Sequence, residues 1–83
     1  MEARGSDMAR SRTFELTALA VAVLRDGDRD EGVALGHEAV DLAERVRSVR
    51  VLDRLTPLRA AAVEAGGGTA RDLAQRVRLV ATG

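Results

Sequence analysis

The stretch that decides the fold is residues 13–46, which reads TFELTALAVAVLRDGDRDEGVALGHEAVDLAERV. In its first half the apolar side chains recur at helical spacing on one broad face: Phe14, Leu16, Leu19, Ala20, Val23 and Leu24. Gly27 ends this helix, because glycine readily adopts the left-handed conformation that closes a helix. Asp28 or Asp30 then caps a second helix, whose acidic first turn suits the helix dipole. The pattern predicts an antiparallel helical hairpin.

The second helix of this hairpin has an inner face of small and branched side chains: Gly32, Val33, Gly36, Ala39, Val40, Ala43 and Val46. Each glycine costs up to about 1 kcal/mol relative to alanine inside a helix. We therefore expect a neighbouring backbone to approach closely at Gly32 and Gly36.

Beyond the hairpin the pattern predicts about two more helices. Ser48 is the expected cap of a third helix with an apolar face of Val51, Leu52, Leu55, Leu58, Ala62 and Val63. Pro57 lies inside it, so this helix either kinks or restarts, with Thr56 as the new N-cap. The triplet 66–68 is a break, and Thr69 with Asp72 opens a final helix. That helix buries Ala70, Leu73, Ala74, Val77 and Val80.

Composition places the chain in the all-α class, as a single domain over residues 12–82 with a flexible leader at 1–11. Good helix formers dominate, and the aromatic and β-branched runs typical of strands are missing.

A chain of 83 residues buries only about 60–65% of its unfolded surface. It has no cysteine and one histidine, so neither a disulfide nor a structural zinc ion is expected to stabilise it. We expect no cofactor, and oligomerisation is the remaining route to stability.

The zero net charge hides an asymmetry between the two halves. Residues 1–44 carry five arginines and ten acids, a balance of −5, whereas residues 45–83 carry eight arginines and three acids, a balance of +5. We expect the halves to attract each other, within one chain or between two. The longest apolar stretch, 16–24, is too short for a membrane span of about twenty residues, so a cytoplasmic protein is expected.

The hairpin resembles one tetratricopeptide repeat. Its signature comprises Leu16, Leu19, Ala20, Gly27, Asp28, Glu31, Gly32 and Ala39. With the later segment Val46-Arg47-Ser48-x-Arg50-Val51, the chain is similar to the C-terminal region of tetratricopeptide-containing helix-turn-helix transcriptional regulators of actinobacteria. This resemblance implies a region that receives a protein or peptide signal, separate from an N-terminal DNA-binding domain for which the chain has no room.

Candidate partner-binding residues cluster in the third helix. Arg47, Arg50 and Arg54 share a face at spacings of three and four, beside Leu52 and Leu55. They form either a basic patch for nucleic acid or an acidic partner, or a solvated face paired with nearby acids. The patch has no aromatic side chains to stack on bases, which disfavours single-stranded nucleic acid.

No arrangement of catalytic groups is evident in the sequence. His37, the only candidate base near neutral pH, stands beside an acid on a polar helix edge and is expected to be a surface residue. We therefore expect a non-enzymatic module that binds a protein or peptide and forms a homodimer. The alternative is a small nucleic-acid-binding regulator that uses the arginine-rich helix.

Overall fold

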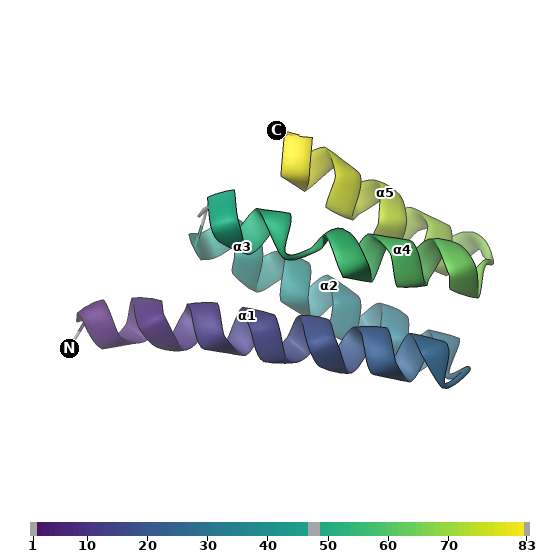
Figure 1. The fold of residues 1–83 in the computed structure, drawn as a ribbon, viewed down its shortest axis with the longest axis horizontal. Coiled ribbons are helices and arrows are strands. Elements are labelled where there is room, and N and C mark those ends of the chain that lie inside the picture. The colour runs from purple at the N-terminus through teal and green to yellow at the C-terminus, as the bar shows by residue number, and fades with distance from the viewer. Residues whose placement is uncertain (1, 47–48, 83) are drawn as a thin grey trace.

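The chain folds into a bundle of α-helices. The computed structural model describes the backbone of residues 2–46 and 49–82 and the side chains of 11–46 and 49–81. No β-strand occurs in those ranges, so the all-α expectation is confirmed. Figure 1 shows the elements, which are α1 (Glu2–Arg25), α2 (Arg29–Val46), α3 (Val49–Asp53), α4 (Thr56–Ala65) and α5 (Gly68–Thr82).

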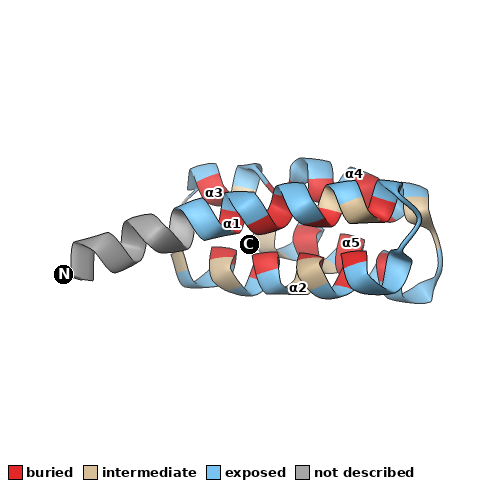
Figure 2. Ribbon diagram, turned by 90° about the horizontal axis from the view of Figure 1, so that it is seen from below, coloured by how far each residue is buried: buried red, intermediate tan, exposed pale blue. Residues whose placement is uncertain are grey.

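The helices form two layers. α1 and α2 make one antiparallel hairpin, and α4 and α5 make another (Figure 1). The hairpins pack so that α1 contacts α4 and α2 contacts α5, with each of these pairs running in the same direction. Figure 2 shows the result edge-on: α1, α3 and α4 form one layer, α2 and α5 form the other, and the buried residues lie between them.

α1 begins at Glu2, whereas the sequence analysis expected the helix to start at Arg12 after a flexible leader. Apart from Gly5 and Ser6, the residues of 2–11 include good helix formers such as alanine, arginine and methionine, and no proline interrupts them. The composition of this segment is therefore compatible with a helix, although its apolar residues show no helical period.

The core is built from small and branched aliphatic side chains. Leu55, Leu58, Leu73, Val40, Val51 and Val77 are its largest fully buried members. The predicted inner face of α2 is confirmed, except that Val46 is half-buried. The predicted face of α1 was partly wrong, because Phe14 is 41% and Leu19 49% exposed. Thr13 and Thr17 are buried in their place, and the Thr17 hydroxyl donates to the Thr13 carbonyl at 2.7 Å.

Gly32 and Gly36 lie at close contacts between helices. A Cβ at Gly32 would stand 2.6 Å from Cγ of Leu24 in α1 and 3.1 Å from its backbone nitrogen. A Cβ at Gly36 would stand 3.2 Å from Cδ1 of Leu73 and closer still to Cδ2. The expected close approach is present, but side chains make most of it. Gly36 thus lets a leucine of α5 reach the backbone of α2.

The turns between the helices form at residues that favour the end or the start of a helix. Gly27 is left-handed with φ of 101°, and Asp28 accepts a hydrogen bond from the Glu31 amide at 3.3 Å, so Asp28 is the residue that caps α2. The predicted restart before Pro57 is confirmed as the gap between α3 and α4. Leu55, rather than Thr56, holds the N-cap position, and it makes no side-chain cap bond. Ser48, the expected cap of the third helix, lies outside the described residues.

A candidate docking face on α1 and α4

The outward surface of α1 is poor in charge. Between residues 13 and 24 the only charged side chain is Glu15, yet the helix lies at the surface of the bundle. Ala18 and Ala22 are exposed, and Phe14 is 41% exposed. A surface helix of a globular protein usually places charged residues on its solvent side. The outward side of α1 therefore has the composition of an interface.

A groove runs along the seam where α1 meets the start of α4. Its volume is about 510 Å³, and it is lined by Phe14, Thr17, Ala18, Val21, Arg54 and Pro57. At one end the Arg54 guanidinium lies 5.8 Å from the centre of the Phe14 ring. This cation–π contact is worth about 0.5–1 kcal/mol at an exposed site and holds Arg54 against α1.

Two further hollows lie on the same side of the bundle. One, of about 190 Å³, lies at the other end of the seam and is lined by Leu24, Arg25, Ala61, Glu64 and Ala65. The other, of about 340 Å³, lies on the outer side of α4 beside Val63, which is 62% exposed. We define the α1–α4 face as the exposed residues of these two helices together with the three hollows. Figure 1 looks onto this face, with α2 behind it.

The opposite layer has a charged surface. Its exposed charged residues are Arg29, Asp30, Glu31, Glu38, Asp41, Glu44, Arg45, Arg71, Asp72 and Arg78. Arg29 also reaches across the bundle end, where its guanidinium donates to the Ala65 carbonyl at 3.3 Å.

Arg76 of α5 links the two helices of that layer through contacts with α2. Its guanidinium donates to Asp41 and, at 3.1 Å, to Glu44, both on α2. It also contacts Nδ1 of His37 at 2.8 Å, so His37 is half-buried rather than a free surface residue. The hydrogen bond to Asp41 is the main cause that raises the pKa of Arg76, against an opposing effect of partial burial. These pairs join the basic and acidic halves, as the charge asymmetry predicted.

Replacing Arg76 with Gln is expected to lower the free energy of unfolding by about 1 kcal/mol, because the acceptor carboxylates are largely exposed and such pairs are worth little in water. The difference should shrink in high salt. Because the pKa of Arg76 is raised, its stabilising charge persists at every pH below that pKa and is lost only as the pH rises through it. The effect is measured by urea denaturation of R76Q. The control is R71Q, which replaces an exposed arginine of the same helix. Equal losses in both variants would contradict the role of Arg76.

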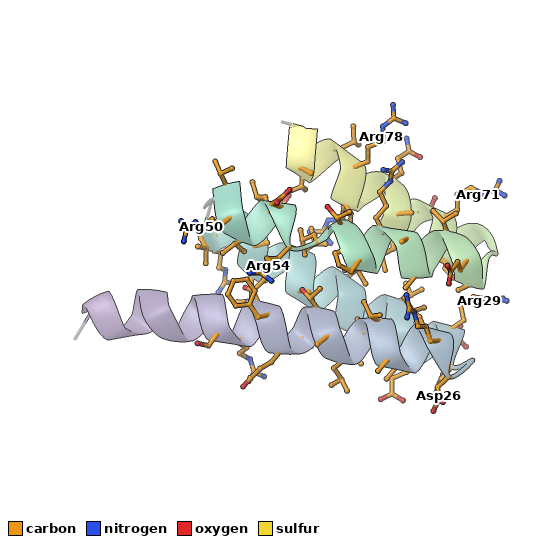
Figure 3. The ribbon with its side chains drawn as sticks, in the orientation of Figure 1. Asp26, Arg29, Arg50, Arg54, Arg71 and Arg78 are labelled. Atoms are coloured by element: carbon orange, nitrogen blue, oxygen red, sulfur yellow. The ribbon has the colours of Figure 1, made fainter. Side chains whose placement is uncertain are left out.

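The predicted partner-binding residues do not form one surface. Leu55 is fully buried and belongs to the core, while Leu52 is half-buried. Arg50 and Arg54 are both exposed, but Arg50 extends from the end of the bundle whereas Arg54 lies against α1 (Figure 3). Arg54 directly follows α3, and its amide still donates to the Arg50 carbonyl at 3.1 Å, so the two residues keep helical spacing although their side chains extend in different directions. Arg47 lies outside the described residues.

The residues of the repeat signature fall mostly at the α1–α2 contact. Leu16, Ala20, Gly32 and Ala39 are buried, and Gly27, Asp28 and Glu31 form the turn. Leu19 is the exception, because it is 49% exposed. The sequence analysis did not identify the α1–α4 face. The signal that marks it is the near absence of charge between residues 13 and 24.

No protein-family model matches the chain, and no curated protein or solved structure matches it significantly. Among the described side chains, no group of histidine and carboxylate residues is arranged to hold a metal ion. None of the helices in the described part of the chain has the length and hydropathy required to cross a bilayer.

Proposed function

We propose that this protein is a non-enzymatic protein–protein interaction module that self-associates and acts in regulation through the α1–α4 face. The observation that carries the proposal is the apolar groove of about 510 Å³ between α1 and α4, beside a surface of α1 on which Glu15 is the only charged residue from 13 to 24. Exposed apolar surface of this kind in a small protein marks an interaction site.

A tetratricopeptide-like architecture is part of the same proposal. Two observations support it: α1 and α2 of the first hairpin pack on α4 and α5 of the second, and small residues line the α1–α2 contact. Stacked hairpins of this type leave an unpaired face at each end and usually need three or more repeats for stability. This proposal also includes a cytoplasmic location, which was expected from the short apolar stretch, and a role among transcriptional regulators, which the sequence resemblance implies.

Nucleic-acid binding by the arginine-rich segment remains the second candidate, but the geometry favours it less. Arg54 lies over Phe14, and Arg50 extends in another direction. Binding that depends on phosphate contacts must weaken steeply as salt rises.

Ala18 and Ala34 offer a matched pair for testing the proposed face. Both are exposed alanines inside helices, one on the α1–α4 face and one on α2. A18E places a charge in the groove and should weaken self-association at least about tenfold, whereas A34E adds the same charge to a charged surface and should leave it unchanged. Sedimentation velocity over a range of concentrations measures both. A chain that is monomeric at every concentration would contradict the proposed self-association.

A further inference from the structure

We infer that the partner on the α1–α4 face is a second copy of this chain, packed with its α1 antiparallel to the first; this inference rests on the proposed function. The arrangement has a two-fold axis that lies in the plane of contact, perpendicular to α1 and level with Ala20. Residues equally distant from Ala20 along the helix then face each other across the axis. Ala18 faces Ala22 of the second copy, and Glu15 faces Arg25 of the second copy.

The charges on α1 favour this orientation. Glu15 and Arg25 are exposed and are the only charged residues of α1 from 13 to its end. Neither forms an ion pair with another residue in the described part of the chain. In the antiparallel arrangement each glutamate meets an arginine, so that symmetry gives two complementary pairs. In a parallel arrangement glutamate would face glutamate and arginine would face arginine, which is unfavourable.

The charges at the two ends of the seam follow the same rule. Arg54 borders the groove at the Phe14 end, and Glu64 borders the hollow at the Arg25 end. Reversal of the second copy brings its Glu64 end against the Arg54 end of the first. Arg59 lies between these two ends and would come near Arg59 of the second copy, so the charge argument for the orientation rests on Glu15 and Arg25 of α1.

The shape of the face is also complementary to itself. Phe14 is the one large ring on it, and part of that ring is exposed. The antiparallel arrangement places Phe14 near the hollow of about 190 Å³ beside Leu24 and Arg25 of the second copy. The small side chains of Ala18 and Ala22 at the centre allow the two helices to approach closely.

The available area is sufficient for a stable dimer. The bundle measures 40 × 24 × 15 Å, and the α1–α4 face is the broad side seen in Figure 1. A standard interface buries about 800 Å² on each partner, which is close to the area of this whole side. A peptide along the seam would cover only part of it. The size of this side is therefore compatible with a second copy.

Charge reversal tests the orientation. E15R and R25E should each weaken the dimer about tenfold or more, because each change puts like charges opposite each other twice. The double variant E15R/R25E should recover most of the affinity, since the pairs re-form with exchanged signs. E38R on α2 alters the net charge as E15R does but lies outside the face, and it should leave the affinity unchanged. Sedimentation equilibrium gives the affinities, and far-UV circular dichroism verifies folding.

Cysteine pairing gives a readout that does not depend on charge. The chain has no cysteine, so A18C and A22C each carry a single thiol. A18C and A22C are mixed, and one of them carries a longer tag so that the disulfide-linked species differ in size. Mild oxidation should then yield the A18C–A22C disulfide in excess over the A18C–A18C and A22C–A22C disulfides. A parallel pairing would instead favour the homodisulfides.

The outcomes separate the inference from the proposed function. A dimer that A18E weakens, but that shows no recovery in E15R/R25E and no excess of mixed disulfide, would overturn the antiparallel orientation alone. A chain that is monomeric at every concentration would overturn the self-association on which the inference rests. Recovery together with mixed disulfide supports both.

Discussion

Replacing Leu58 with Ala is expected to lower the free energy of unfolding by about 2–5 kcal/mol. Leu58 is fully buried in α4, and its side chain lies close to Gly36 of α2. The substitution removes apolar contacts and leaves a cavity where α4 meets α2. At roughly 0.05–0.15 kcal/mol per residue, a chain of this length is stable by about 4–12 kcal/mol, so L58A should lose a large fraction of its total stability.

Val63 of the same helix provides the control. It is 62% exposed, so V63A should change the free energy of unfolding by less than about 0.5 kcal/mol. The chain contains no tryptophan or tyrosine, so urea denaturation is followed by far-UV circular dichroism. Both variants are compared at a protein concentration where the chain is monomeric, because Val63 borders the proposed α1–α4 face and self-association contributes to apparent stability. Equal stabilities of L58A and V63A would contradict the core described above.

Replacing Gly36 with Val is expected to destabilise the protein by about 1–3 kcal/mol or more. The added Cβ would overlap the end of Leu73, and Cδ1 of Leu58 would lie 3.4 Å away. Leu73 is fully buried and has little room to move, so α2 and α5 must separate. This steric cost exceeds the few tenths of a kcal/mol that valine gains over glycine in helix propensity.

Gly68 at the start of α5 is the matched control for this change, because a Cβ there would meet no atom within 4 Å. G68V should alter the free energy of unfolding by less than about 0.5 kcal/mol. The double variant G36V/L73A should cost less than the sum of its two single changes, since the shortened side chain leaves space for the valine. Strict additivity would show that Gly36 and Leu73 do not compete for the same volume.

The helical class and the order of the helices could be predicted from the sequence, because they depend on local signals. Gly27 and Asp28 mark the first turn, and Pro57 marks the restart of the third helix. The inner face of α2 was also predictable. This helix contacts the others along a single stripe, and that stripe coincides with its small residues.

The surface of α1 could not be predicted in the same way, because both of its sides carry apolar residues. Which side is buried depends on where α4 lies, and α4 packs beside α1 through residues distant in sequence. The periodicity therefore included Leu19 and Phe14 in the core face, and they are half exposed.

Leu55 was assigned to a partner-binding surface because it stands among arginines. In the structure the chain turns between α3 and α4, and this turn directs Leu55 into the core. The contacts of Arg76 with α2 could be predicted only as a general attraction between the acidic and the basic half of the chain. No local sequence pattern identifies the acids with which Arg76 pairs.

The fit between Gly36 and Leu73 also limits how this sequence can diverge. A larger residue at position 36 is acceptable only after position 73 has become smaller, so the order of the two substitutions matters. Drift at these positions should therefore be compensatory, with their combined volume conserved among descendants of this chain. Positions such as Gly68, where no neighbour is near, should vary without such coupling.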